Sequence, residues 1–535
     1  MNEQHATRMT ELEAGSVIAV EQLDGAGPEL PADDGDGTPG IGARLIAFAR
    51  TIHPAAWLTG IGSLVFAVVF GRLGVQHHRN FGTWAYDMGI YDQGFWLVSR
   101  GKSWMTVRGL DFWGHHTNLI VVAFVPFYWL GAGPSFLYVA QAATLGAGAI
   151  PTYLLARDRM RNPWIGLVFA VVYLLYAPIQ WISWANFHPE ALVITPLLFA
   201  WWFGTRRRWR PFFIALVIAL STREDVALAV FMMGLVLWFM IRHDDEADQR
   251  DRRLALVTAA LGVVWYAVCT RLVIPAFNQG RQPFYVEAFY GNYGSDTFEV
   301  AKTILSRPDR VISDATQPDR LRFYRDLFVP WGGLPLAGAG QLVMALPQML
   351  ASVIGLSPYA RTIRYQYTSV MIAPIVIASI EGTALLWRYR FVRRFLVPWL
   401  LVCAYVTNIA WSPSPISANS GVWAQPTERH AAMRTAVAMI PDSASVTATY
   451  ALGPHLSHRE QIYDWPNPWV PAYWGNDDTY RLPAPSEIDY VVLDRNHVGQ
   501  AQQELLADLV GPDGEFEVLF DESDVVVGRR RPASP

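Results

Sequence analysis

Long apolar runs separated by short polar segments are the feature that most constrains this chain. A helix that crosses a bilayer needs about 20 mainly apolar residues, and somewhat shorter ones occur in packed bundles. About eleven segments approach this pattern: 57–75, 135–156, 163–182, 190–204, 211–221, 226–242, 254–275, 326–340, 341–356, 366–385 and 395–411. The sequence therefore predicts a polytopic α-helical membrane protein with about eleven transmembrane helices.

The composition agrees with this class and excludes others. Of the 535 residues, 52% are hydrophobic and only 16% are charged, and the mean hydropathy is +0.19. Soluble domains carry about 25% charged residues. No basic run is long enough to indicate nucleic-acid binding. The two cysteines, Cys269 and Cys403, lie in apolar runs, which excludes a disulfide framework and a cysteine-based zinc site.

Positive charge predicts the orientation in the membrane. Lys and Arg concentrate in short cytoplasmic loops, and the chain has basic clusters at 157–161, 206–210, 242–253 and 388–394, with Arg44 and Arg50 before the first helix. All of them face the cytoplasm together only if the apolar stretch 117–131 lies in the interface or re-enters the membrane. We therefore expect a cytoplasmic N-terminus and no crossing at 117–131.

This topology requires two tight hairpins, 211–242 and 326–356. Their tips, "STRED" and "AGAGQ", would lie within the outer leaflet. Irregular backbone at that depth is tolerated only where it is buried in protein or lines a cavity. The arrangement thus predicts a polar cavity on the outer side of the membrane.

Three domains follow from these patterns. Residues 1–50 are polar, acidic and rich in Gly and Pro, which is typical of a disordered cytoplasmic tail. Residues 51–411 form the membrane domain, with a first external loop at 76–134. Residues 412–535 are predicted to form a small extracytoplasmic α/β domain, with strands in "SASVTATY", "YVVLDR", "FEVLF" and "VVVGRR" and helices near 427–440 and 499–510.

The outer segments carry polar residues that are costly near hydrocarbon and often functional there. We expect the following to share one cavity: Asp87, Asp92, Gln93, His115 and His116 from the first external loop; His188 and Glu190 from "NFHPE"; Arg223, Glu224 and Asp225 from "STRED"; and Arg364 and Tyr367 from "ARTIRYQY". Arginine presents a planar fork that suits phosphate oxygens. A carboxylate can deprotonate a hydroxyl or orient a divalent metal.

Each of these groups also has a purely structural interpretation. The two aspartates can be solvated carboxylates of an interfacial helix, and the adjacent histidines can cap the helix that follows. Glu190 is favourable at the positive N-terminal end of a helix. Arg223 can simply pair with Asp225, and Arg364 can anchor to lipid headgroups. The functional interpretation rests on the convergence of all these segments.

The motifs "YDMGIYDQGFW", "HHTNLI", "FHPEAL", "STREDVAL", "LPQML", "YQYTSVMIAP" and "ATYALGPHLSHREQIY", in this order, resemble the bacterial membrane protein family known as domain of unknown function 2079. The resemblance covers roughly residues 57–500. That family is in turn distantly similar to the GT-C glycosyltransferases, integral membrane enzymes that use polyprenyl-phosphate-linked sugars at the outer face of the membrane.

The resemblance implies roles for particular residues. GT-C enzymes carry a catalytic aspartate in the first external loop, which matches Asp87 here, with Asp92 as second choice. His116 matches a histidine at the start of a loop helix. These enzymes often pair two neighbouring acids, whereas Asp87 and Asp92 are five positions apart. A divalent cation, Mg²⁺ or Mn²⁺, is a candidate cofactor, with Asp87 and His116 as its candidate ligands.

The sequence thus predicts a membrane glycosyltransferase of the bacterial cytoplasmic membrane. It would transfer a sugar from a polyprenyl-phosphate donor to a cell-envelope glycan, lipid or protein. Asp87 would act as base, and Arg223 and Arg364 would bind the donor phosphate. The alternative is a non-enzymatic transporter of polyprenyl phosphate or lipid, or a membrane scaffold.

Overall fold

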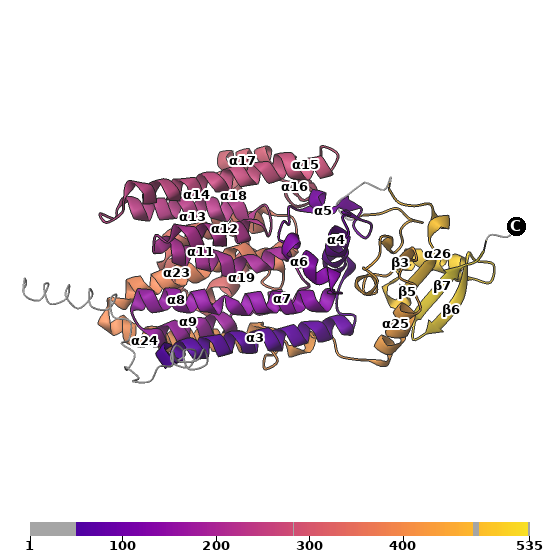
Figure 1. Cartoon of the computed structure of the whole chain (residues 1–535), viewed down its shortest axis with the longest axis horizontal. Coiled ribbons are helices and arrows are strands. Elements are labelled where there is room, and N and C mark those ends of the chain that lie inside the picture. Colours follow the sequence, from indigo (N-terminus) through magenta and orange to yellow (C-terminus); the bar gives the residue numbers. More distant parts are fainter. Residues whose placement is uncertain (1–49, 282, 474–480, 533–535) are drawn as a thin grey trace, which may run out of the picture. The chain divides into compact units, whose positions relative to one another are not determined.

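The computed structural model describes residues 50–281, 283–473 and 481–532 (Figure 1). The predicted tail, 1–50, lies outside the described residues except for Arg50. Residues Pro54–Pro535 group into one compact unit. That unit carries every element discussed below.

Apolar helices form the framework of residues 54–411. They are α3 (Pro54–Arg79), α7 (Pro134–Ala147), α8 (Ala149–Met160), α9 (Pro163–Leu175), α10 (Ala177–Trp184), α11 (Ile194–Thr205), α12 (Trp209–Leu220), α13 (Val226–Arg242), α14 (Gln249–Val268), α23 (Ser369–Trp387) and α24 (Arg390–Trp411). Local sequence signals set several of their ends. For example, the side chain of Asn162 accepts hydrogen bonds from the first turn of α9, and Pro163 occupies its first position.

Five helical stretches in the described part of the chain are long and apolar enough to cross a membrane: Pro54–Arg79, Pro134–Met160, Gln249–Phe277, Gln366–Trp387 and Arg390–Trp411. The pair α9–α10, bent by 42°, makes up to six. The class of helical membrane protein is therefore confirmed, whereas the expected count of about eleven spans is not reached by length and composition. The shortfall comes mainly from short helices such as α12, whose 12 residues span about 18 Å, less than a hydrocarbon core.

The segment 326–356 is not the pair of continuous helices that the sequence predicted. It consists of the end of α19 (Pro318–Phe328), then η4 (Val329–Trp331), α20 (Leu334–Ala337), α21 (Ala339–Leu342), η5 (Val343–Ala345) and α22 (Leu346–Ile354). Gly332 and Gly333 adopt positive φ angles of 62° and 76°, which end the first helix. At Gly338 a Cβ would collide with the carbonyl oxygen of Ala378, so glycine permits close packing on α23.

The first external loop is built from short elements. They are η1 (Ala85–Gly89), α4 (Ile90–Val98), the antiparallel pair β1 (Trp104–Met105) and β2 (Leu110–Asp111), α5 (Phe112–His115) and α6 (Val121–Trp129). Helix α6 has only 9 residues. It is shorter than a bilayer crossing requires, in line with the prediction that 117–131 is not a span.

A second set of short helices follows α14. It comprises η3 (Cys269–Val273), α15 (Ile274–Phe277), α16 (Phe284–Tyr290), α17 (Thr297–Ser306) and α18 (Pro308–Ala315) before α19. Two single turns, η6 (Pro358–Arg361) and η7 (Gln366–Thr368), precede α23, and η2 (Pro189–Val193) precedes α11.

The C-terminal region contains a five-stranded mixed sheet of order β4-β3-β5-β7-β6. The elements are η8 (Ser420–Val422), α25 (Glu428–Ala438), β3 (Val446–Ala448), η9 (Gly453–His455), β4 (Ile462–Asp464), η10 (Pro485–Glu487), β5 (Tyr490–Asp494), η11 (Arg495–His497), η12 (Gln500–Gln502), α26 (Gln503–Val510), β6 (Phe516–Glu522) and β7 (Val525–Arg530). Strand β3 runs parallel to β4 and β5, whereas β7 is antiparallel to both neighbours. The four predicted strands are present, and β4 is an addition.

The first external loop and the C-terminal region share one hydrophobic core. Met88 and Phe95 belong to the same buried cluster as Leu452 and Ile462. The backbone N–H of Ala85 also donates to the carbonyl oxygen of Tyr450 at 2.9 Å. The loop that carries Asp87 is therefore held in place by residues more than 350 positions later in the chain.

Candidate functional site

A cavity of about 1180 Å³ lies where the outer segments meet. Its lining includes residues of the four segments that supplied the predicted site: the first external loop, the turn 186–190, the hairpin tip 221–225 and the segment 357–367. The loop 276–325 contributes further lining residues. Tyr450 of the C-terminal region completes the lining. None of the lining residues belongs to the four basic clusters. The structure thus gathers the predicted polar groups on one side of the helical domain.

Asp87 and His188 form a pair at the wall of this cavity. Asp87 lies in the single π-helical turn η1 between α3 and α4, and its side chain is a quarter exposed. The Oδ1 atom of Asp87 lies 3.2 Å from Nε2 of the buried His188. The backbone N–H of His188 donates to Gln141 at 3.0 Å, which fixes its position. Burial opposes a charged imidazole, but the hydrogen bond and charge of Asp87 raise the pKa of His188.

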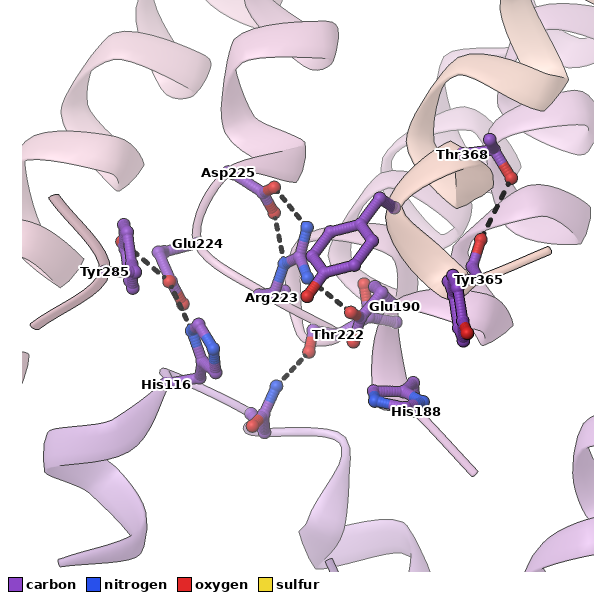
Figure 2. A network of polar contacts seen from close by, with 12 residues as sticks. His116, His188, Glu190, Thr222, Arg223, Glu224, Asp225, Tyr285, Tyr365 and Thr368 are labelled. Carbon is purple, nitrogen blue, oxygen red and sulfur yellow. Dashed lines mark hydrogen bonds and ion pairs between the residues drawn. The ribbon is translucent and has the colours of Figure 1, made fainter. Parts of the chain in front are cut away.

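Arg223 occupies the centre of the network in Figure 2. Its guanidinium bonds Asp225, with Nε to Oδ1 at 2.7 Å, and also contacts Glu190. Glu190 is almost completely buried in the turn η2. The tip of the α12–α13 hairpin is therefore tied to the turn before α11 by a buried ion-pair network, which sets the shape of the cavity floor.

Glu224 points to the opposite side of the hairpin tip (Figure 2). It lies 2.7 Å from Nδ1 of His116 and accepts hydrogen bonds from the backbone N–H of Thr117 at 3.0 Å and the hydroxyl of Tyr285 at 2.9 Å. Burial disfavours its charged form, but the charge and hydrogen bond of His116 lower the pKa of Glu224 to about 2. Glu224 therefore stays ionised and holds the first external loop against α16.

Two further predicted residues, His115 and Tyr367, line the cavity and pack against aromatic rings. His115 is buried and stacks on Phe284, with ring centroids 5.3 Å apart. Tyr367 meets the ring of Phe289 edge-on at 6.2 Å. Of the predicted site, the cavity thus brings together Asp87, His115, His116, His188, Glu190, Arg223, Glu224, Asp225 and Tyr367.

Three predicted residues do not line this cavity. Asp92 is fully buried and accepts hydrogen bonds from Tyr128 at 2.7 Å and Ser457 at 2.5 Å. Gln93 donates to the carbonyl oxygen of Arg459 at 3.0 Å. Both residues join the first external loop to the C-terminal region. Arg364 is exposed, and its guanidinium carbon lies 4.9 Å from the centre of the Trp181 ring.

The structure adds Arg108, which the sequence reasoning missed. Arg108 is almost completely buried, lines the cavity, and lies 4.6 Å from the centre of the Phe284 ring. Burial lowers its pKa to about 10, so it is still cationic at neutral pH. An arginine in the predicted external loop runs against the positive-inside bias, and that signal was available in the sequence.

No group of three or more His, Cys, Asp or Glu residues in the described part of the chain is arranged to hold a metal ion. The two candidate ligands belong to separate pairs, Asp87 with His188 and His116 with Glu224. Binding of Mg²⁺ or Mn²⁺ through Asp87 and His116 therefore stays a prediction.

The fold is that of a helical membrane protein whose cavity is lined partly by a residue of the α/β region after the last helix. The family described as "Predicted membrane protein (DUF2079)" matches residues 77–527. The chain belongs to this family. A comparison with curated proteins gives no significant match.

A solved structure shares the fold. The crystal structure of ArnT from Cupriavidus metallidurans bound to undecaprenyl phosphate matches with a TM-score of 0.52 and 12% sequence identity. The match covers 90% of this chain and 99% of that one. At this level of identity the likeness concerns the fold alone.

Proposed function

We propose that this protein is a glycosyltransferase of the bacterial cytoplasmic membrane. It would use a polyprenyl-phosphate-linked sugar at the outer face and transfer the sugar to a cell-envelope acceptor. In this proposal the membrane domain crosses the bilayer about eleven times, and the C-terminal domain, 412–535, lies outside the cytoplasm. The observation that carries the proposal is the Asp87–His188 pair on the wall of a large cavity.

The lining of the cavity suits an amphipathic substrate. One part carries the ionisable groups around Asp87 and Arg223. Another part, contributed by α16, α17 and α22, is apolar and includes Val286, Val300 and Leu350. A polyprenyl phosphate needs both environments, because its chain is hydrocarbon and its head is an anion. The similarity in fold to a protein bound to undecaprenyl phosphate supports this assignment.

Asp87 would act as general base. As the acceptor hydroxyl attacks the anomeric carbon of the donor, its proton passes to Asp87, and the bond from that carbon to the phosphate oxygen breaks. The polyprenyl phosphate leaves as an anion. His188 would hold Asp87 in the orientation that accepts the proton and would stabilise its carboxylate before the reaction.

The departing phosphate needs positive charge nearby. The guanidinium groups of Arg108 and Arg223 line the cavity, and we assign the phosphate to their neighbourhood. Three nitrogens of Arg223 already contact Glu190 and Asp225, so its main role would be to shape the floor. Arg364, the other arginine expected to bind phosphate, lies off the cavity wall.

The cavity also favours an enzyme over the alternative of a transporter. A transport path must reach both sides of the membrane, with a site near the midplane. The lining residues include none from the basic clusters at 157–161, 206–210, 242–253 and 388–394, which mark the proposed cytoplasmic side.

Replacement of Asp87 tests the proposal. In a strain that lacks the gene, we expect polyprenyl-phosphate-linked sugar to accumulate, and the wild-type gene to reverse this. Asp87→Asn should lower transfer by about 10²–10⁴-fold because it removes the base, while the protein still inserts and folds. Asp309→Asn, at a side chain that is 67% exposed and far along the chain in α18, is the matched control and should behave as wild type. Full complementation by Asp87→Asn would refute the assignment.

A further inference from the structure

Five aromatic rings form a continuous wall beside Asp87. They are Tyr86, Tyr450, Trp84, Tyr365 and Tyr359, in the order in which neighbouring rings meet. The successive ring centroids are 6.0, 6.5, 6.5 and 5.2 Å apart. We call these five residues the aromatic wall. All five line the cavity.

The wall is assembled from three distant parts of the chain. Trp84 caps the turn η1 that carries Asp87, and Tyr86 lies within that turn. Tyr359 and Tyr365 precede α23, and Tyr450 follows strand β3. The Trp84 and Tyr450 rings are inclined by only 18°. A second layer supports them, since Trp184 meets Trp84 edge-on at 5.7 Å and the backbone N–H of Trp84 donates to Asn186 at 3.3 Å.

Packing alone does not account for these rings. Aromatic residues of a core are buried, whereas Tyr359 is 57% exposed, and Trp84, Tyr365 and Tyr450 are each only partly buried. Within the described residues, no hydrogen bond engages the hydroxyls of Tyr359, Tyr365 and Tyr450 or the indole N–H of Trp84. The wall thus presents flat apolar faces together with uncommitted hydrogen-bonding groups.

We propose that the aromatic wall is the acceptor subsite and that it binds a carbohydrate ring. A sugar ring has an apolar C–H face that packs on an aromatic ring and peripheral hydroxyls that need polar partners. Tyr and Trp supply both at a low entropic cost. A hydroxyl of a sugar on this wall would lie near the carboxylate of Asp87, because that carboxylate and the five rings line the same cavity. Burial and, to a smaller extent, the nearby charge of Asp87 raise the pKa of Tyr365 and Tyr450 in the wall.

The chemistry of the wall argues against other acceptors. A hydrocarbon chain gains nothing from phenol hydroxyls, and the apolar part of the cavity near α16, α17 and α22 provides for one separately. An anionic acceptor would need cations, and the five wall residues carry none. The role of this subsite as the acceptor site rests on the proposed function. Binding of a sugar to the wall can be tested by itself.

The test is saturation-transfer NMR on the purified full-length protein in nanodiscs. The probes are methyl glycosides of glucose, galactose, mannose and arabinose, with adenosine and a phosphopeptide measured in parallel. We expect at least one glycoside to receive saturation, strongest at the C–H protons of one ring face. Trp84→Ala should lower that signal at least threefold, and Tyr450→Phe and Tyr365→Phe, which keep the rings, should weaken it less.

Control variants are available on the exposed side of α24. Trp399→Ala and Tyr405→Phe change side chains that are 54% and 59% exposed and do not line the cavity, so the signal should not change. The subsite is overturned if no glycoside receives saturation, if the wall variants leave the signal intact, or if only adenosine or the phosphopeptide binds.

Binding of a polyprenyl phosphate in the same nanodiscs separates the two proposals. If it binds while no glycoside does, the carbohydrate subsite fails and the proposed function stands. If a glycoside binds in a Trp84-dependent manner while polyprenyl phosphate does not, the subsite stands and the proposed function fails.

Discussion

Two aspartates five residues apart occupy different environments. Asp87 faces the cavity and His188, whereas Asp92 is buried against Tyr128 and Ser457. In the sequence both residues sit among aromatics in the same motif. The π-helical turn at Ala85–Gly89 widens the backbone just before α4, and helices of this kind are frequent at functional sites.

Asp92 is expected to contribute to stability through its buried hydrogen bonds. Asp92→Ala leaves the hydroxyl of Tyr128 without an acceptor, and an unsatisfied buried group costs about 1–3 kcal/mol. It also removes the carboxylate that lies 3.0 Å from the His458 ring, whereas Ser457 can still donate to the carbonyl oxygen of Pro454. The temperature of half-unfolding in detergent should fall by several degrees for Asp92→Ala. It should fall less for Asp92→Asn, because the amide retains one acceptor oxygen. Melting of Asp92→Ala at the wild-type temperature would contradict this role.

The sequence revealed most of the polar cavity but not its aromatic and cationic partners. Charged residues in apolar surroundings are conspicuous because they are costly there, which is why Glu190 and Arg223 were found. Arg108 lies between ordinary loop residues, and Tyr450 is one aromatic among many. Only the tertiary contacts between the first external loop and the C-terminal region reveal that both face the cavity.

At the scale of elements, α17 is distinctive because its opposite faces have different neighbours. Thr297, Val300 and Ile304 line the cavity, whereas Phe298 and Leu305 are 68% and 83% exposed. Helix α18 continues the pattern with Ile312, which is 63% exposed. Amphipathic helices with bulky apolar residues on one face lie in the interface of a bilayer.

We therefore predict that α17 is in contact with lipid. Nitroxide labels at Phe298 and Leu305 of the protein in nanodiscs should collide with oxygen, which concentrates in hydrocarbon. A label at Glu299, which is exposed on a different face of the same helix, should instead collide with a water-soluble nickel reagent. Equal accessibility of Leu305 and Glu299 to the nickel reagent would show that α17 lies in water.

Elements with a regular pattern were predicted well. The strands β5 and β7, which are short runs of apolar residues, and the helix α25 follow their sequence signals closely. Strand β4 was missed because its two apolar residues, Ile462 and Tyr463, stand between polar residues and form no recognisable run. The segment 326–356 is apolar throughout, so hydropathy could not reveal the breaks at Gly332, Gly333 and Gly338, which depend on packing against α23.

For the whole molecule, the central prediction concerns orientation. Gln425 and Arg208 are both exposed, and the proposed topology places them on opposite sides of the membrane. The two native cysteines are buried, so they give little background. A membrane-impermeant maleimide added to intact cells should label Gln425→Cys and not Arg208→Cys, and both should react after lysis. Labelling of Arg208→Cys alone in intact cells would show that the topology is the reverse of the proposed one.

The contribution of Tyr450 to the cavity has a consequence for biogenesis. Ribosomal synthesis delivers the helices first, and the strand that positions Tyr450 emerges only after α24 has been made. Until then the backbone N–H of Ala85 lacks its acceptor, the carbonyl oxygen of Tyr450, and the aromatic wall lacks one of its five rings. A nascent chain halted beyond α24 would be inserted yet inert, so any chemistry at Asp87 must await completion of the polypeptide.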